Sequence, residues 1–181
     1  MEKTIYEQAR QKALAIYEKA HIVLTSQEKA NLEVADFGLN DLERTGLEII
    51  TYVNTERCCA KEMVLFPRQT CPEHRHAPIE GTPYVGKEET FRVRFGTCYL
   101  YVDGEVTENP ACNPPEGRET WYTARHEIML LPGEQYTLHP NMRHWFQAGP
   151  EGAVISEFST KSYDEHDIFT DPDIIRLSIV E

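Results

Sequence analysis

From residue 47 onward, apolar and polar side chains alternate over many short segments, as they do in half-buried β-strands. Residues 90–95 show this most clearly, with Phe91, Val93 and Phe95 on one face and two arginines on the other. Similar composition predicts strands over residues 47–53, 62–66, 90–95, 98–102, 127–131, 135–138, 144–147 and 153–158. Turn residues separate them at 103–104, 132–133, 140–141 and 149–152. Many short strands with regular turns indicate a sandwich or a barrel.

The N-terminal region has a helical pattern instead. Apolar residues at three- and four-residue steps, from Ile5 to Ala20, predict a helix over the first twenty residues. A second short helix is expected from Ser26 to about Asn31, followed by a loop at Gly38 and Asn40. We therefore expect one domain over residues 1–181, with a helical extension at 1–46 and a β-barrel at 47–176.

Composition narrows the classes of partner. The net charge of −12 and the absence of a basic cluster argue against nucleic acid. No apolar run is long enough to span a bilayer, and the polar N-terminus does not resemble a signal peptide. The five cysteines are an odd number without a C-x-x-C pair, which predicts reduced thiols in a cytoplasmic protein.

Two interpretations of the acidic segment at residues 164–173 are open. The favoured one is a solvated loop followed by a short terminal strand or helix. The other is a segment that covers the mouth of a site or contacts a neighbouring subunit.

A candidate metal site begins with His74 and His76, which point to the same side of an extended backbone because strand side chains alternate. In the register of residues 90–95, Glu89 lies on the apolar, inward face with Phe91, and so does Lys87 if the strand begins that early. A charged group on a core face is costly unless it is paired or binds a metal. Glu88 falls on the outer face and is the weaker candidate ligand.

The last two strands add a third histidine and a second carboxylate. His144 shares a face with Phe146, and Glu157 shares one with Ala153 and Ile155, although a one-residue slip would expose Glu157 or leave it ion-paired on the surface. Three imidazoles and a carboxylate suit Mn²⁺, Fe²⁺, Co²⁺, Ni²⁺ or Zn²⁺. The remaining histidines lie outside these positions and are interpreted as non-ligands: His21, His126, His139 and His166.

These motifs resemble known sequences. The order of the H-x-H pair, Glu89, and the stretch from Gly133 through Pro140 to His144 is similar to the two metal motifs of the cupin superfamily. More specifically, the chain from about Leu47 to Arg176 resembles the D-lyxose isomerase family. The strings that carry this resemblance are Cys71-Pro-Glu-His-Arg-His76, Gly86-Lys-Glu-Glu-Thr-Phe-Arg92, Pro132-Gly-Glu-Gln-Tyr-Thr-Leu138, His144-Trp-Phe-Gln-Ala-Gly-Pro-Glu-Gly152 and Ser156-Glu-Phe-Ser-Thr160.

The resemblance implies a mainly β fold, the cupin double-stranded β-helix (jelly-roll) barrel, in a homodimer. It implies a Mn²⁺-dependent aldose–ketose isomerase, with Co²⁺ or another divalent ion as alternatives, that acts on free D-lyxose and D-xylulose and on D-mannose and D-fructose. It also implies that His74, His76, Glu89 and His144 bind the metal and that Lys87 and Glu157 are catalytic. The loop at residues 77–85 varies within the family and is expected to influence sugar preference.

The mechanism expected from this resemblance is proton transfer by Glu157 through a cis-enediol, with Lys87 stabilising charge or moving an oxygen-bound proton. A hydride shift is the alternative. Competing functions are a phosphosugar isomerase, an Fe²⁺ oxygenase and a non-enzymatic sugar-binding barrel. Some aromatic side chains are candidates for a sugar-stacking wall, although most are expected in the core: Tyr84, Phe91, Phe95, Trp145 and Phe158.

Overall fold

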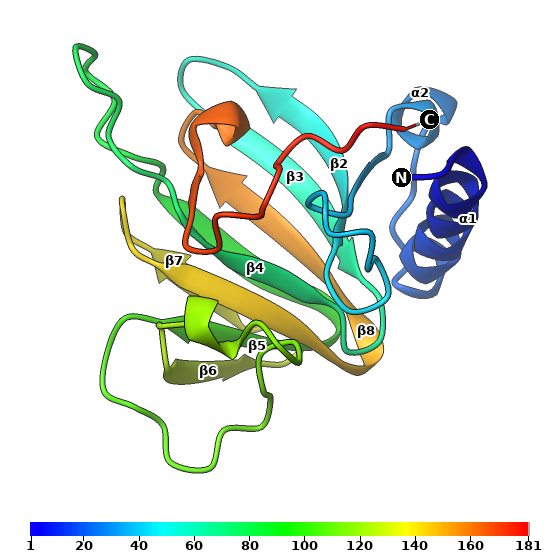
Figure 1. Cartoon of the computed structure of the whole chain (residues 1–181). Coiled ribbons are helices and arrows are strands. Elements are labelled where there is room, and N and C mark those ends of the chain that lie inside the picture. The colour runs from blue at the N-terminus through cyan, green and yellow to red at the C-terminus, as the bar shows by residue number, and fades with distance from the viewer. Residues whose placement is uncertain (181) are drawn as a thin grey trace.

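The computed structural model describes residues 1–180 and consists mainly of antiparallel strands that curl around a core (Figure 1). Two helices precede the barrel, α1 (Lys3–Lys19) and α2 (Ser26–Ala30), and two 3₁₀ turns lie at Glu119–Trp121 and Asp164–His166. The strands are β1 (Glu33–Ala35), β2 (Leu47–Asn54), β3 (Cys59–Leu65), β4 (Thr70–Arg75), β5 (Glu89–Val102), β6 (His126–Leu130), β7 (Gln135–Leu138), β8 (His144–Ser159) and β9 (Ile168–Phe169). The mainly β, cupin-type barrel with an N-terminal helical extension is confirmed.

Two long strands, β5 and β8, connect the parts of the barrel. They pair with each other along most of their length. The first half of β8 also pairs with β4, and its second half pairs with β3, so the sheet runs in the order β1-β2-β3-β8-β4-β9. Strands β6 and β7 extend the sheet from β5. This arrangement brings the inward faces of β3, β4, β5 and β8 together around one pocket.

The sequence predicted two separate strands in place of β5 and two in place of β8. This is wrong, because each strand continues through a bulge. The stretch between Ala148 and Ala153 lies opposite Thr97 alone, and β5 continues across Gly96. Two glycines permit this close approach: a Cβ on Gly96 would lie 2.0 Å from the carbonyl oxygen of Gly152. Both glycines also have positive φ angles, 69° for Gly96 and 84° for Gly152, which side chains disfavour.

The barrel encloses the larger apolar core, and a second cluster attaches the N-terminal helix to the outside. Helix α1 buries Ala9, Ala13, Ile16 and Tyr17 against apolar residues of the sheet. The hydroxyl of Tyr17 donates a hydrogen bond to the carbonyl of Glu62 at 2.6 Å. The predicted extension also contains the short strand β1, which pairs with β2. The helical extension is therefore continuous with the sheet.

The C-terminal segment, residues 161–176, runs across the front of the barrel strands and is called the cover segment below (Figure 1). The favoured prediction of a solvated loop is wrong for Asp164, Asp167 and Asp171, which are half-buried or buried, although Glu165 and Asp173 are exposed. Lys61 holds Asp164 at 2.8 Å, β9 pairs with β4, and Ile175 donates its amide to the carbonyl of Phe37 at 2.9 Å. An ion pair with the buried Lys61 and strand pairing with β4 thus hold the acidic segment against the barrel.

Two further predictions concern covalent links and membranes. All five cysteines are free thiols, and only Cys58 is exposed. Among residues 1–180 no helix is long and apolar enough to cross a bilayer.

Candidate metal centre and active site

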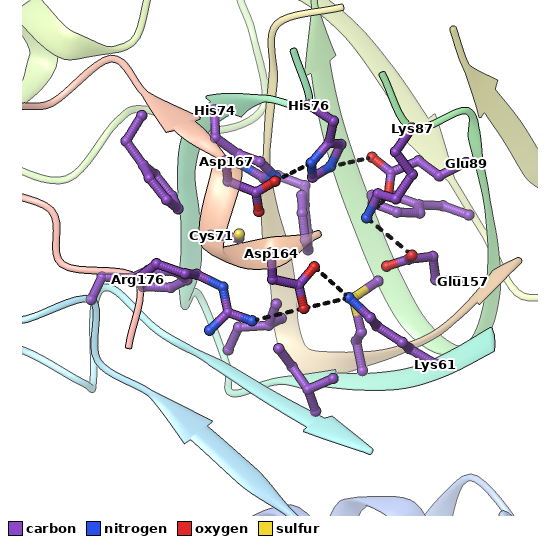
Figure 2. Close-up of a pocket in the computed structure, with 17 residues that line it drawn as sticks. Lys61, Cys71, His74, His76, Lys87, Glu89, Glu157, Asp164, Asp167 and Arg176 are labelled. Carbon is purple, nitrogen blue, oxygen red and sulfur yellow. Dashed lines mark hydrogen bonds and ion pairs between the residues drawn. The ribbon is translucent and has the colours of Figure 1, made fainter. Parts of the chain in front are cut away.

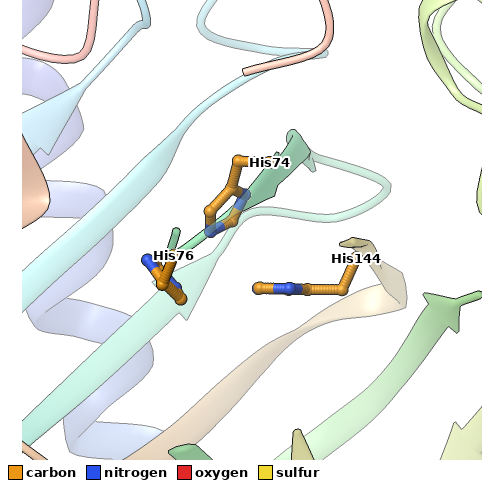
Figure 3. Close-up of side chains that lie close together, drawn as sticks. All are labelled: His74, His76 and His144. Atoms are coloured by element: carbon orange, nitrogen blue, oxygen red, sulfur yellow. The ribbon is translucent and has the colours of Figure 1, made fainter. Parts of the chain in front are cut away.

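Three buried histidines meet at the inward end of two neighbouring strands (Figure 3). His74 is the next-to-last residue of β4, His76 lies just beyond that strand, and His144 begins β8, where it is the register partner of His74. One ring nitrogen from each residue lies within 4.8 Å of the others. The alternation of β4 therefore places both members of the H-x-H pair beside the histidine of β8, as the sequence predicted.

Each imidazole is oriented through its Nδ1 atom. The Nδ1 atom of His74 lies 2.8 Å from the carbonyl oxygen of Pro72, and that of His144 lies 3.0 Å from the carbonyl oxygen of Met142. The Nδ1 atom of His76 is hydrogen-bonded to the carboxylate of Asp167 in the cover segment. Because a carbonyl or carboxylate accepts the Nδ1 proton, each Nε2 atom is directed toward the centre of the cluster, which is the arrangement that a metal site requires.

Glu89 contacts two of the three histidines. Its Oε1 atom lies 3.0 Å from Nε2 of His76 and 3.2 Å from Nε2 of His144, and its Oε2 atom lies 2.7 Å from Nζ of Lys87. The side chain of Glu89 is only 1% exposed, whereas that of Glu88 is 53% exposed. The inward register predicted for Glu89 agrees with this geometry, and Glu88 points away from the cluster. Lys87 also points inward, although β5 begins only at Glu89.

The charges in the cluster favour an anionic Glu89 beside a cationic Lys87. Burial alone would raise the pKa of Glu89, but Lys87 and His76 lower it well below its usual range. Burial would likewise lower the pKa of Lys87, but Glu157 and Glu89 raise it. Burial and the two neighbouring imidazoles lower the pKa of His74, which is therefore neutral and able to bind a metal.

A divalent metal fits this cluster. Among residues 1–180, the Nε2 atom of His144 is one of only two buried side-chain polar atoms without a hydrogen-bond partner. Buried polar atoms are nearly always hydrogen-bonded. Here Nε2 of His144 has only Oε1 of Glu89 at 3.2 Å, and two acceptors cannot bond to each other, whereas both can bind one cation. Three imidazoles with one carboxylate are a common donor set for Mn²⁺, Co²⁺ and related ions.

Glu157 lies across the pocket from the histidines (Figure 2). It faces Phe91 of β5 and Lys61 of β3 in the sheet, and its side chain is 3% exposed. Its Oε1 atom accepts hydrogen bonds from Nζ of Lys87 at 3.1 Å and from the hydroxyl of Ser159 at 2.9 Å. Lys87 thus connects the two buried carboxylates, and the predicted inward register of Glu157 agrees with the structure.

The structure adds pocket residues that were not named as candidate site residues: Lys61, Asp164, Asp167, Phe169 and Arg176. Lys61 had a usable signal, because it alternates with Met63 and Leu65 on an apolar face, but the strand was predicted to begin one residue after it. The other four come from the cover segment. Arg176 and Lys61 both pair with Asp164, at 3.3 and 2.8 Å, and Phe169 lies against the ring of His74.

Of the five aromatic residues considered for a sugar-stacking wall, only Phe91 lines the pocket. Trp145 stacks on Tyr101 in a separate cluster, Phe95 packs in the cluster that holds α1, Tyr84 contacts Tyr163, and Phe158 is 51% exposed. The four histidines interpreted as non-ligands lie outside the cluster described above, and the side chain of His139 is 71% exposed.

Comparisons with known proteins agree with the geometry. A family model described as D-lyxose isomerase matches residues 16–181. The chain is 60% identical to the D-lyxose/D-mannose isomerase of Thermosediminibacter oceani, over 100% of this chain and 99% of the relative. It is 57% identical to the D-lyxose ketol-isomerase of a Thermofilum species, over 97% and 96% of the two chains. The L-ribose isomerase of Acinetobacter sp. DL28 shares the fold, with a TM-score of 0.81 at 16% identity over 100% and 98% of the two chains.

Proposed function

This chain belongs to the D-lyxose isomerase family, and we propose that it interconverts D-lyxose and D-xylulose, and D-mannose and D-fructose, with a bound divalent ion. The names of the relatives support an aldose–ketose isomerase that acts on lyxose. The observation that carries the metal dependence is the buried histidine cluster with an unpartnered Nε2 atom on His144. We propose His74, His76, Glu89 and His144 as the ligands and Mn²⁺ as the ion, with Co²⁺ as an alternative.

The reaction moves one proton between C2 and C1 and a second between the attached oxygens. The divalent ion supplies Lewis-acid polarisation of the sugar oxygens when it is bound. Glu157 takes the C2 proton of the aldose and returns it to C1 through a cis-enediol. Ser159 and Lys87 fix the carboxylate of Glu157 by hydrogen bonds, which orients one oxygen toward the sugar.

Lys87 has a second role in this proposal. Because Glu157 and Glu89 overcome the effect of burial and raise its pKa, Lys87 is protonated at neutral pH. Its ammonium group can donate a hydrogen bond to the oxygen that gains negative charge as the C–H proton leaves. The same group can pass the oxygen-bound proton from the O2 atom to the O1 atom.

The substrate class is a free sugar rather than a sugar phosphate. A phosphate needs an uncompensated cation or a row of free backbone amides. The pocket does contain Lys61 and Arg176, but Asp164 pairs with both, and Glu33 pairs with Arg176 at 2.5 Å. These paired charges can exchange hydrogen bonds with sugar hydroxyls, but they leave no net positive charge for a phosphate.

The proposed assembly rests on the family resemblance, and the proposed location rests on the cysteine pattern. We propose a homodimer in the cytoplasm, without nucleic-acid or membrane partners, which agrees with the net charge of −12. Sedimentation equilibrium at several protein concentrations tests the dimer, and a species with the mass of one chain at every concentration would contradict it.

The experiment that tests the proposed function is metal removal and replacement. The purified protein is treated with a chelator, dialysed, and assayed for ketose formation from D-lyxose, D-mannose and a panel of other free aldoses. We expect activity to disappear on removal and to return with Mn²⁺ or Co²⁺ but not with the chelator-treated buffer alone. Full activity in verified metal-free protein would contradict the metal dependence, and activity only on phosphorylated sugars would contradict the substrate class.

A further inference from the structure

Glu73 is a buried carboxylate that the proposed chemistry does not use. It precedes His74 in β4, is only 1% exposed, and by strand alternation points away from the metal cluster. Its two oxygens accept four hydrogen bonds: from the amides of Thr123 and Ala124 at 2.5 and 2.7 Å, and from the hydroxyls of Thr123 and Thr170 at 2.8 and 2.6 Å. A buried carboxylate with this many donors fixes the segments that supply them.

The two segments lie on different sides of Glu73. Thr170 belongs to the cover segment, directly after β9, and its amide also donates to the carbonyl of Glu73 at 3.1 Å. Its neighbour Phe169 pairs with His74 in the sheet, and Asp167 holds Nδ1 of His76. The Glu73–Thr170 contact therefore attaches the cover segment to the strand that carries two histidines of the cluster.

Thr123 belongs to a loop that does not line the metal pocket. Its hydroxyl also accepts a hydrogen bond from Arg143 at 2.9 Å, and the neighbouring Ala124 accepts one from the indole of Trp145 at 2.8 Å. Thr123 and Thr170 thus donate the same kind of hydrogen bond to the same carboxylate, but only Thr170 belongs to the cover segment, where its neighbour Phe169 lines the metal pocket.

We propose that Glu73 is a positioning residue for the metal centre, which acts through Thr170 to hold the cover segment closed over the histidine cluster. With the segment closed, Asp167 keeps the His76 ring in the orientation of a ligand. Opening of the segment removes that partner and exposes the centre to solvent. The part of this inference that concerns the metal rests on the proposed function, whereas the part that concerns the cover segment does not.

The test compares Thr170→Val with Thr123→Val, two isosteric changes that each remove one hydroxyl donor from Glu73. Thr170→Ser keeps the hydroxyl and serves as the conservative rescue. Glu73→Gln is a fourth variant, which places a side-chain amide against several hydrogen-bond donors. If this variant does not fold, the two valine variants still test the proposal. Thermal unfolding of each protein measures the general loss of stability.

The first measurement is amide hydrogen exchange of residues 164–170 by mass spectrometry. Loss of a hydrogen bond to a charged acceptor changes an opening equilibrium by about tenfold or more. We expect exchange in the cover segment to become about tenfold faster in Thr170→Val, and to stay near the wild-type rate in Thr123→Val and Thr170→Ser. Equal exchange in the two valine variants would overturn the proposal.

The second measurement is the rate at which Mn²⁺-loaded protein loses its metal to excess chelator. If the ion leaves through the opened cover segment, this rate should rise by the same factor of about ten in Thr170→Val only. Faster exchange without faster metal loss would overturn the link to the metal centre while leaving the role in holding the segment. A wild-type protein that binds no Mn²⁺ would contradict the proposed function, and the exchange comparison would still decide the role of Glu73 in closure.

Discussion

The barrel and the cover segment enclose the same pocket, but their side chains are held in different ways. The barrel wall, as used below, consists of the inward residues His74, His76, Lys87, Glu89, His144 and Glu157. Its imidazoles are anchored through Nδ1, which leaves their Nε2 atoms toward the centre. The cover segment contributes groups that are already paired with the barrel, such as Asp164 with Lys61 and Asp167 with His76. The barrel wall thus supplies the candidate ligands and catalytic groups, and the cover segment orients His76 and pairs with Lys61.

The electrostatics agree with this division. Burial alone would raise the pKa of Asp164, but Lys61, Lys87 and Arg176 lower it well below its usual range. Asp164 is therefore an anion that neutralises cations of the barrel. Removal of a barrel ligand should abolish the metal centre, whereas removal of a cover-segment partner should weaken it. The predictions below test this ranking.

The largest effect is expected for His144→Ala. This change removes a barrel-wall ligand from a fully buried position, so metal binding and activity should both be lost. The matched control is His139→Ala, which removes an imidazole whose side chain is 71% exposed. Metal content by elemental analysis and ketose formation are measured for both. Retention of stoichiometric metal in His144→Ala would show that the barrel wall is not the ligand set.

Asp167→Asn should weaken the centre without abolishing it. The carboxylate holds Nδ1 of His76, and loss of such a partner typically costs about 10–100-fold in metal affinity. Glu165→Gln is the control, because this carboxylate lies in the same cover segment but is exposed. Competition with a chelator of known affinity measures both variants. An unchanged metal affinity in Asp167→Asn would contradict a role of the cover segment in metal binding.

Metal affinity should also depend on pH, because His76 contacts both Glu89 of the barrel wall and Asp167 of the cover segment. Burial and Lys87 would lower the pKa of His76, but Glu89 and the hydrogen bond to Asp167 raise it to about 9 in the metal-free protein. The Nε2 atom must lose its proton to bind a metal, so below that pKa binding releases a proton and the affinity falls by up to about tenfold per pH unit. Calorimetry in buffers of different ionisation enthalpy counts the released proton. An affinity that does not change between about pH 7 and about pH 8 would contradict this assignment.

The smallest effect is expected for Glu88→Gln. Glu88 is adjacent to Glu89 but points outward and is 53% exposed, so metal affinity should stay within about twofold of the wild type. Chelator competition is again the measurement. A large loss of metal affinity would mean that the strand face of a carboxylate does not decide whether it binds the metal.

The barrel wall and the cover segment also differ in how far the sequence predicts them. The barrel wall was predictable because strand alternation ties the direction of a side chain to that of the residue two positions away. Glu89 shares a face with Phe91, His144 with Phe146, and Glu157 with Ile155. The same alternation would also have identified Lys61 as an inward residue if the start of β3 had been placed correctly. The roles of these residues came from resemblance to a family, since alternation gives direction but not chemistry.

The cover segment could not be predicted in this way. Asp164, Asp167 and Arg176 lie in turns and irregular chain, where no period relates a residue to its direction. Their partners are far away in the sequence, as with Asp167 and His76, so local composition could not decide between a solvated loop and a segment that covers a site. The bulges of β5 and β8 were missed for a related reason: glycine and proline usually end a strand, and only the tertiary pairing shows that the strand continues.

The most direct test of the account is the metal content and the turnover of Glu157→Gln, measured on the same Mn²⁺-loaded sample. We expect stoichiometric metal, because Glu157 lies across the pocket from the histidines and contacts Lys87 rather than the cluster. We also expect ketose formation from D-lyxose, and exchange of the C2 proton with solvent, to fall by about 10²–10⁴-fold. Near-wild-type turnover and proton exchange with full metal content would contradict the assignment of Glu157 as the base.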